Sequence, residues 1–349
     1  MPRTRVLVVE DSLTVRKRLV ELIGTDPELA LVGEAADGKQ AIELCLRERP
    51  DVITMDMMLP VMSGLAATEY IMAHCPTPIL VVSASLNRGE LFRTYEALAA
   101  GAVDVLEKPT GVEPDGVWEQ RLLATVKLVA RIRVVTHPRA RLNGLTQAAA
   151  PPPAPARACE VAAIGASTGG PGAIVQVLRG LPDGFAPPIL FVLHIDQPFG
   201  PAFAEWLDGQ SARRVRYAEE GAPLAAAAGQ VVMAPPGRHL TLRDGRLRMS
   251  DEPPRHSCRP SVDVLFESVA RDRGAAAIAC LLTGMGRDGA AGLLAVRRAG
   301  GRTIAQDEAT SVVYGMPREA ALLGAVEQVL PLDRIGPALA TLARVRAEA

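Results

Sequence analysis

The chain has 349 residues, which is enough for two domains of ordinary size with a core in each. Its net charge is −1 and its basic residues are scattered, so the composition gives no electrostatic reason to expect nucleic acid as a partner. No apolar run could cross a bilayer and the first ten residues lack a signal-peptide pattern, so we expect a cytoplasmic protein without direct membrane insertion.

Strand and helix patterns alternate five times in residues 1–133, which we predict to be the first domain. Short apolar runs predict strands at 6–9, 52–55, 79–82 and 103–106, with a weaker one at 31–34. Helical periodicity predicts helices at 13–23, 41–47, 65–74, 91–99 and 118–132. Five such units indicate an α/β fold with a doubly wound, flavodoxin-like parallel sheet covered on both faces.

Polar side chains stand where these strands end. The first strand ends at Glu10 and Asp11, the third at Asp56, the fourth at Ser83 and the fifth at Lys108. The carboxyl ends of parallel strands meet at one edge, where three carboxylates would repel one another unless a cation such as Mg²⁺ lay among them. A lysine and a hydroxyl nearby could hold phosphoryl oxygens, so this edge could accept a phosphoryl group on a carboxylate.

Residues 5–127 therefore resemble a response-regulator receiver domain. The motifs that carry the resemblance are Glu10-Asp11, Met55-Asp56-Met57, Pro60, Gly64, Ser83-Ala84 and Lys108-Pro109. The resemblance implies phosphorylation at Asp56 and Mg²⁺ bound by Glu10, Asp11, Asp56 and the backbone carbonyl of Met58. It also implies that Ser83 is the switch hydroxyl and that Lys108 senses the phosphate.

The resemblance has one departure, and one alternative to it stays open. Val105 stands where many receivers carry an aromatic switch residue, so the resemblance does not extend to signalling through an aromatic flip. The domain could also keep the receiver fold without being phosphorylated.

Residues 134–158 are predicted to be a linker. The run A-A-A-P-P-P-A-P-A at 148–156 cannot build a core and favours an extended, semi-stiff backbone. His137 falls in this segment, and we expect it at the surface.

The second domain, residues 159–349, is predicted to be α/β as well, with a mainly parallel sheet and an antiparallel hairpin. Strands are expected at 161–164, 189–195, 215–218 and 230–234. Two further strands, 239–242 and 247–250, flank Asp244-Gly245, which is a hairpin signal. Helices are expected at 173–178, 262–271, 291–299, 316–329 and 335–346.

The stretch V-A-A-I-G-A-S-T-G-G-P-G at 161–172 predicts a strand, a tight turn and a helix start. It holds Ser167 on a bend near the N–H groups of the helix N-terminus, and it fits the G-x-S-x-G pattern of a nucleophilic serine. The alternative is a glycine-rich turn that binds an anion. The stretch matches neither common nucleotide-binding loop.

A catalytic serine needs a base and an orienting acid. His194 follows the apolar run 189–193 and is the expected base, because that strand end lies at the same edge as Ser167. His239 and His256 remain alternatives. Asp288, in the turn T-G-M-G-R-D-G at 283–289, is the expected acid, although it could simply cap the helix that follows.

Residues 159–349 also resemble the effector domain of chemotaxis protein-glutamate methylesterases. The resemblance rests on G-A-S-T-G-G at 165–170, His194, G-M-G-R-D-G at 284–289, C-R-P-S-V-D at 258–263 and M-A-P at 233–235. It implies Thr168 as an orienter of His194 and the backbone N–H of Met285 as an oxyanion donor. Substrate-side or structural roles are expected for His256 and Arg259.

The combined resemblance implies a phosphorylation-regulated enzyme without a cofactor for hydrolysis. It would hydrolyse γ-glutamyl methyl esters on chemoreceptors and deamidate receptor glutamines, and a chemotaxis-type histidine kinase would be its phosphodonor. The unphosphorylated receiver would cover the Ser167 edge. The alternative is a receptor-binding adaptor without turnover.

The cysteines predict no site of their own. None of the five forms a C-x-x-C pair, so neither a zinc site nor a disulfide framework is indicated. We expect small, mostly buried side chains at Cys45, Cys75, Cys159, Cys258 and Cys280.

Overall fold

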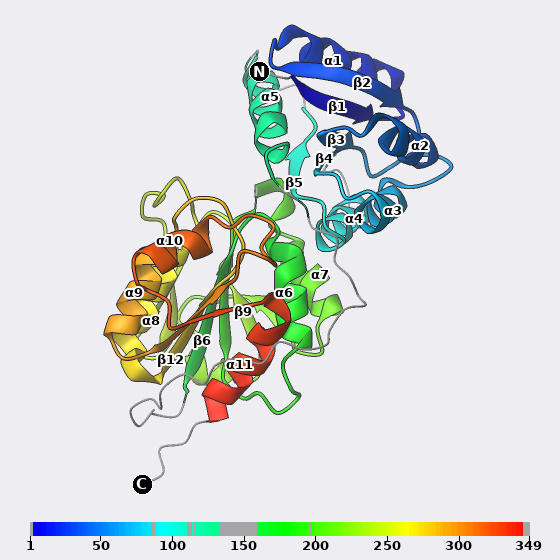
Figure 1. The fold of residues 1–349 in the computed structure, drawn as a ribbon. Helices are drawn as coiled ribbons and strands as arrows, with labels where there is room; N and C mark the ends of the chain where they lie inside the picture. Colours follow the sequence, from blue (N-terminus) through cyan, green and yellow to red (C-terminus); the bar gives the residue numbers. More distant parts are fainter. Residues whose placement is uncertain are drawn as a thin grey trace. The chain divides into compact units, whose positions relative to one another are not determined.

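The computed structural model describes residues 3–84, 88–109, 114, 116–132, 134, 159–195 and 197–344 (Figure 1). They divide into two compact units, which are treated separately below. Apart from residue 134, the predicted linker at 134–158 lies outside the described residues. Among the described helices, none combines the length and the apolar character that a membrane crossing needs.

The N-terminal unit is a five-stranded sheet with all pairs parallel, in the order β2-β1-β3-β4-β5. Its strands are β1 (Thr4–Val9), β2 (Leu29–Ala35), β3 (Val52–Met55), β4 (Ile79–Ser83) and β5 (Asp104–Glu107). Its helices are α1 (Leu13–Thr25), α2 (Gly38–Glu48), α3 (Gly64–His74), α4 (Arg88–Ala99) and α5 (Val117–Val129). α1 packs on α5, while α3 packs on both α2 and α4. The predicted doubly wound fold is confirmed.

The C-terminal unit has a seven-stranded parallel sheet, in the order β14-β13-β12-β6-β7-β9-β8, and a separate hairpin. The sheet strands are β6 (Val161–Ala166), β7 (Ile189–Leu193), β8 (Val215–Tyr217), β9 (Val231–Met233), β12 (Ala277–Leu281), β13 (Arg302–Gln306) and β14 (Gln328–Leu330). The hairpin pairs β10 (His239–Arg243) with β11 (Arg246–Ser250). Its turn is Asp244-Gly245, as predicted, with both residues at positive φ.

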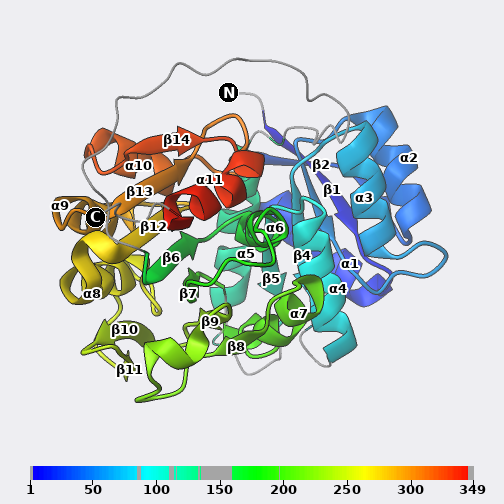
Figure 2. The same cartoon turned by 90° about the horizontal axis from the view of Figure 1, so that it is seen from below.

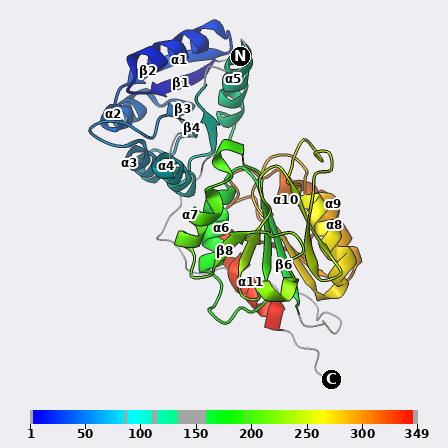
Figure 3. The same cartoon turned by 180° about the vertical axis from the view of Figure 1, so that it is seen from behind.

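Helices cover both faces of this sheet. They are α6 (Gly170–Arg179), α7 (Phe203–Gln210), α8 (Val262–Arg273), α9 (Ala290–Arg298), α10 (Met316–Leu322) and α11 (Leu332–Arg344). α8 and α9 pack together on one face, whereas α6 and α11 pack together on the other, as Figures 2 and 3 show from two sides. The strands between them are buried on both sides, which explains their continuous apolar runs.

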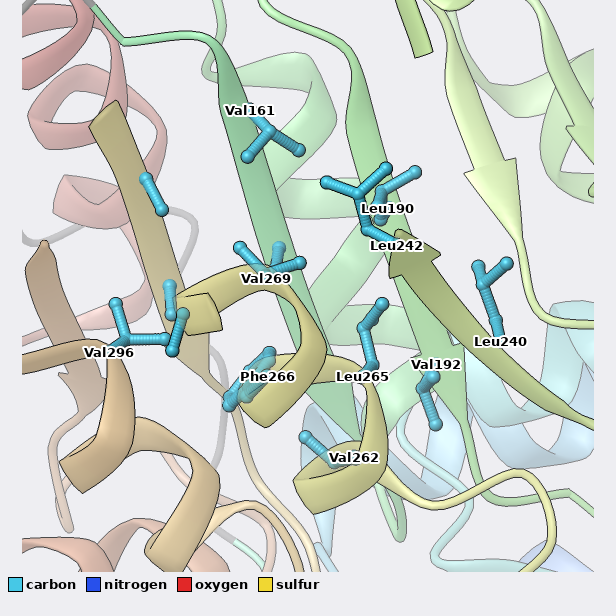
Figure 4. Packing of buried hydrophobic residues seen from close by; sticks show 14 of the residues in the cluster. Val161, Leu190, Val192, Leu240, Leu242, Val262, Leu265, Phe266, Val269 and Val296 are labelled. Atoms are coloured by element: carbon cyan, nitrogen blue, oxygen red, sulfur yellow. The ribbon is translucent and has the colours of Figure 1, made fainter. Parts of the chain in front are cut away.

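The core on the α8 side joins three elements (Figure 4). α8 contributes an apolar stripe that contacts the sheet and the hairpin: Val262, Leu265, Phe266 and Val269. The sheet contributes Leu190 and Val192, and the hairpin contributes Leu240 and Leu242. This packing holds the N-terminus of α8 beside the carboxyl ends of β6 and β7.

The structure corrects the prediction of one helix over 316–329. α10 ends at Leu322, and Gln328–Leu330 forms β14 alongside β13, a strand that the sequence patterns also missed. β13 offers unpaired backbone groups at its edge, and pairing with them overrides the local helical pattern. Gly165, which we expected in the turn, lies inside β6.

Candidate functional site

Ser167 lies on the predicted bend between β6 and α6. Gly169 has a φ of +77°, which favours glycine, and Pro171 lies in the first turn of α6. The Ser167 N–H donates to the carbonyl of Thr283 at 3.0 Å, and its own carbonyl accepts from the Gly170 N–H at 2.7 Å. These backbone bonds fix the bend and leave the hydroxyl half-exposed.

The loop after β12 packs directly against this bend. A Cβ added to Gly284 would lie 2.7 Å from the Cβ of Ser167, so only glycine allows the approach. The Gly284 carbonyl accepts from the Met316 N–H at 2.9 Å, which turns the loop. The Met285 N–H donates to no group within the described residues, and its role as an oxyanion donor stays a prediction.

His194 follows β7 at the same edge. Ala166 pairs with Leu193, and the His194 N–H donates to the Ala166 carbonyl at 3.0 Å. The His194 Nε2 lies 2.9 Å from the Asp288 Oδ2, with side chains only 14% and 2% exposed. The structure thus brings the predicted base and acid into hydrogen-bonding contact beside Ser167.

Asp288 binds the N-terminus of α8. Its Oδ1 accepts from the Ser261 hydroxyl at 2.7 Å and from the Asp263 N–H at 3.1 Å. Its Oδ2 accepts from the Val262 N–H at 2.7 Å as well as from His194. The alternative role as a cap of the following helix is wrong, because Gly289 is the N-cap of α9.

This environment shifts the pKa of both partners. Burial alone would raise the pKa of Asp288, but the His194 bond, the Ser261 hydroxyl and the N-terminus of α8 outweigh it, and the pKa is lowered. Burial alone would lower the pKa of His194, but the bond to Asp288, helped by Cys258, raises it to about 9. Asp288 is therefore ionised at neutral pH, and its negative charge favours the imidazolium form of His194.

The second ring nitrogen of His194 contacts a residue that we did not predict. The Cys258 Sγ lies 3.6 Å from the His194 Nδ1. No hydrogen bond joins the Ser167 hydroxyl to His194 among the described residues, so the role of His194 as the base of Ser167 stays a prediction.

Thr168 has a backbone role in the structure. Its carbonyl accepts from the Thr283 Oγ1 at 3.0 Å. The expected contact between the Thr168 side chain and His194 is not among the described hydrogen bonds, so the role of Thr168 as an orienter stays a prediction.

The two alternative histidines are engaged elsewhere. His239 is fully buried: its Nδ1 accepts from the Ser261 N–H at 3.1 Å, and its Nε2 lies 3.2 Å from the Pro253 carbonyl. His256 has its Nε2 3.2 Å from the Asp263 Oδ2 and its Nδ1 3.3 Å from the Arg287 Nε. Both rings therefore tie backbone and side chains around the N-terminus of α8.

Cys258 is placed by a two-residue turn that the sequence patterns missed. Arg255 and Cys258 exchange two backbone hydrogen bonds, at 2.8 and 3.1 Å. His256 and Ser257 between them have φ of 50° and 63°, a geometry that usually takes glycine or asparagine. The sequence has no glycine at this turn to predict it. The structure shows that the turn places the Cys258 Sγ 3.6 Å from the His194 Nδ1.

The N-terminal unit has a second polar cluster at the carboxyl ends of β1, β3 and β5. Oxygens of Glu10, Asp11 and Asp56 lie within 4.8 Å of one another. The Lys108 Nζ lies 2.8 Å from the Glu10 Oε2 and 3.1 Å from the Asp56 Oδ2. Glu10 and Asp56 are buried, whereas Asp11 is exposed.

Burial and charge shift two groups in this cluster. Burial raises the pKa of Glu10, an effect that Lys108 opposes and the Asp56 charge adds to. Burial opposes the charge of Lys108, but Asp56 and Glu10 outweigh it and raise its pKa. Lys108 therefore stays cationic beside two buried carboxyl groups.

The other predicted residues of this unit have less defined roles. Ser83 is buried at the end of β4, and its hydroxyl donates to the Ala84 carbonyl at 3.4 Å. Met58 is exposed, and its Sδ contacts Arg93 at 3.0 Å; the role of its carbonyl stays a prediction. Val105 is buried in β5.

Comparisons with known proteins match both units of the chain. Residues 162–339 match the family model described as CheB methylesterase, and residues 6–114 match that of the response regulator receiver domain. A protein-glutamate methylesterase/protein-glutamine glutaminase 2 of Anaeromyxobacter dehalogenans is 46% identical over 97% of each chain. A protein-glutamate methylesterase/protein-glutamine glutaminase of Nitrosospira multiformis is 41% identical over 98% of each. The crystal structure of the Thermotoga maritima CheB methylesterase catalytic domain, 34% identical, covers 53% of this chain and 98% of its own at a TM-score of 0.50.

Proposed function

This chain belongs to the CheB methylesterase family, and we propose that it is a phosphorylation-regulated protein-glutamate methylesterase and protein-glutamine glutaminase. It hydrolyses γ-glutamyl methyl esters and releases methanol. With glutamine as the substrate, the same acyl chemistry releases ammonia.

The observation that carries the proposal is the His194–Asp288 hydrogen bond beside the Ser167 bend. The His194 Nε2–H donates to Asp288, which leaves Nδ1 as the base that takes the Ser167 proton. The Ser167 oxygen attacks the acyl carbon, and His194 returns the proton to the leaving methanol or ammonia. Water, activated by the same nitrogen, then hydrolyses the acyl-enzyme.

The Met285 N–H supports the oxyanion part of this proposal. It donates to no described group and belongs to the loop that packs on Ser167. A donor at this place stabilises the negative oxygen of the tetrahedral intermediate, and loss of one such donor costs about 3–4 kcal/mol of barrier in other serine hydrolases. Thr168 is proposed to help orient His194.

The acidic cluster of the receiver unit supports phosphorylation at Asp56. Within the described residues, Lys108 is the cation that forms ion pairs with the buried Glu10 and Asp56. Together with the exposed Asp11, these carboxyl groups offer oxygen ligands that suit Mg²⁺. Glu10, Asp11, Asp56 and the Met58 carbonyl would hold the ion, which would neutralise phosphoryl charge. Lys108 would hold a phosphoryl oxygen, and Ser83 would act as the switch hydroxyl.

The partners follow from this chemistry. The proposed substrate is the methylated region of a chemoreceptor, and the proposed phosphodonor is a chemotaxis-type histidine kinase. Both would be met in the cytoplasm, which is the location we propose for the chain.

Replacing Ser167 by alanine tests the esterase proposal. We expect methanol release from methylated receptor to fall by about 10⁴-fold or more, because the variant lacks the nucleophile. Circular dichroism and the melting temperature should match the parent chain, since the half-exposed hydroxyl makes no hydrogen bond within the part of the chain that the structure describes.

An adaptor without turnover is the alternative that this experiment separates. It predicts that the parent chain binds the receptor and releases no methanol above the background of S167A. A variant with full methanol release would instead overturn the assignment of Ser167.

A further inference from the structure

The proposed mechanism gives Cys258 no role, although its thiol contacts the His194 Nδ1, which is the proposed general base. Its Sγ lies 3.6 Å from the His194 Nδ1 and 3.4 Å from the His256 carbonyl. The thiol is half-buried and the His194 side chain is 14% exposed, so small ions can reach both.

We propose that Cys258 and the Nδ1 of His194 form a binding site for Zn²⁺ that switches the hydrolase off. A cysteine sulfur and an imidazole nitrogen are the two protein ligands that zinc prefers. The ion displaces the thiol proton of Cys258 and the Nδ1 proton of the imidazolium form of His194. Both protons leave to solvent, and the thiolate and the neutral imidazole then bind the ion.

The observed spacing suits one ion shared by two ligands. With Zn–S of about 2.3 Å and Zn–N of about 2.05 Å, two ligands of a tetrahedral ion stand roughly 3.6 Å apart. The sulfur and nitrogen stand 3.6 Å apart here, so neither side chain has to move far. The remaining positions on the ion are open to water.

Asp288 supplies the carboxylate that holds the second nitrogen of the His194 ring, Nε2. Zinc-binding histidines usually donate their second N–H to a carboxylate, which fixes the ring and makes the free nitrogen a better ligand. The His194 Nε2 is 2.9 Å from the Asp288 Oδ2, and three further donors hold that carboxylate in place. His194, Cys258 and Asp288 also offer ligand atoms within 4.8 Å of one another.

The consequence for catalysis follows from the shared nitrogen. Nδ1 has one lone pair, and it cannot bind zinc and accept the Ser167 proton at the same time. Occupancy of this site therefore removes the general base, and removal of the ion restores it.

Cobalt binding tests the site without any use of activity. We expect Co²⁺ added to the full chain to give a thiolate-to-metal charge-transfer band in the near ultraviolet. C258S should lose this band and bind Zn²⁺ at least ~10-fold more weakly in competition with a chelating dye, on the scale of losses seen when metal sites are altered.

Two control variants keep the test specific. C159S removes the other half-buried thiol, two residues before β6, and should keep the band. E10Q weakens the oxygen cluster of the receiver unit, which has no sulfur ligand, and should leave the band unchanged. No band in the parent chain, or a band that survives in C258S, overturns the proposal.

Inhibition by zinc tests the switch, and this step rests on the proposed function. We expect Zn²⁺ to suppress methanol release reversibly with EDTA, at a concentration at least ~10-fold higher for C258S when each chain is compared with its own zinc-free rate. A cobalt band with no inhibition by zinc overturns the switch. A cobalt band in a chain that releases no methanol even without zinc overturns the proposed function and leaves the metal site standing.

Discussion

At the scale of single residues, His194 is held between an anion and a thiol. Its Nε2 lies 2.9 Å from the Asp288 Oδ2, and its Nδ1 lies 3.6 Å from the Cys258 Sγ. The bond to Asp288 overcomes the effect of burial and raises the pKa of His194 to about 9. Catalysis needs the neutral ring, so the same bond that orients the base also limits how much of it is active at neutral pH.

The dependence of kcat/KM on pH should show the effect of the His194–Asp288 hydrogen bond on the pKa of His194. With a pKa of about 9, roughly one imidazole in a hundred is neutral at pH 7, and kcat/KM should rise about tenfold per pH unit toward pH 9. In D288N the anion is gone and burial dominates, so the rising limb should move to lower pH. The plateau should fall by about 10⁴-fold.

This profile should be measured on the unphosphorylated chain in the presence of EDTA, which removes trace metal from Nδ1. An inflection at the same pH in D288N and in the parent chain would rule out Asp288 as the cause of the raised pKa.

At the scale of elements, the N-terminus of α8 holds the carboxylate of Asp288, the proposed catalytic acid. Ser261 caps this helix through the Val264 N–H, and its hydroxyl also donates to Asp288. Two backbone N–H groups of the same turn bind Asp288 as well. The partial positive charge of a helix N-terminus thus keeps a buried carboxylate ionised, and the packing of α8 on the sheet decides where that carboxylate lies.

Ser261→Ala should therefore affect stability and activity together. We expect a loss of about 1 kcal/mol from the missing cap and a further 1–2 kcal/mol because the buried carboxylate loses a donor. Methanol release should fall as well, since Asp288 is less firmly held. Calorimetric unfolding and the methanol assay measure the two effects.

Ser63→Ala is the matched control. Ser63 caps α3 through the Ala66 N–H, and within the described residues its hydroxyl has no hydrogen bond to a carboxylate. It should cost about 1 kcal/mol in the N-terminal unit and leave the unstimulated rate unchanged. Equal losses of activity in both variants would mean that Ser261 acts through general stability and not through Asp288.

At the scale of the whole molecule, a receiver unit and a hydrolase unit share one chain. Each has its own sheet and its own buried core. A receiver next to an enzyme implies regulation by phosphorylation, and the parts of a phosphoacceptor site lie together around Asp56. Phosphorylation acts by shifting a population between states of different activity.

A small phosphodonor with Mg²⁺ should raise methanol release by the parent chain, and EDTA should abolish the rise. D56N should keep the unstimulated rate and show no rise, because it lacks the acceptor carboxylate. Stimulation that persists in D56N would contradict phosphorylation at this residue.

A fragment that begins near residue 158 tests whether the unphosphorylated receiver unit inhibits the hydrolase unit. If it does, the fragment should release methanol faster than the unphosphorylated whole chain.

Much of the fold and of the two sites was readable from local patterns. Short apolar runs located most strands, and period-3.6 apolar spacing located most helices. Polar residues just after the runs that form β1, β3, β5, β6 and β7 indicated which side chains lie at the strand ends. This works because parallel strands place their carboxyl ends at one edge, so a residue's place in its own element already selects its neighbourhood. The elements missed in the second unit include the helix α7 and the strands β13 and β14. The two strands depend on pairing with a neighbour that local spacing does not reveal.

The sequence by itself thus determined the two α/β units, the bend at Ser167, and His194 and Asp288 as partners. Only the tertiary structure decided that Asp288 binds the N-terminus of α8, that His239 supports Ser261, and that Cys258 touches His194. These contacts join segments far apart in the chain, and nothing in the local spacing of either partner encodes the other. They exist because α8 packs its apolar stripe on the sheet and carries its first turn to the edge where the strands end.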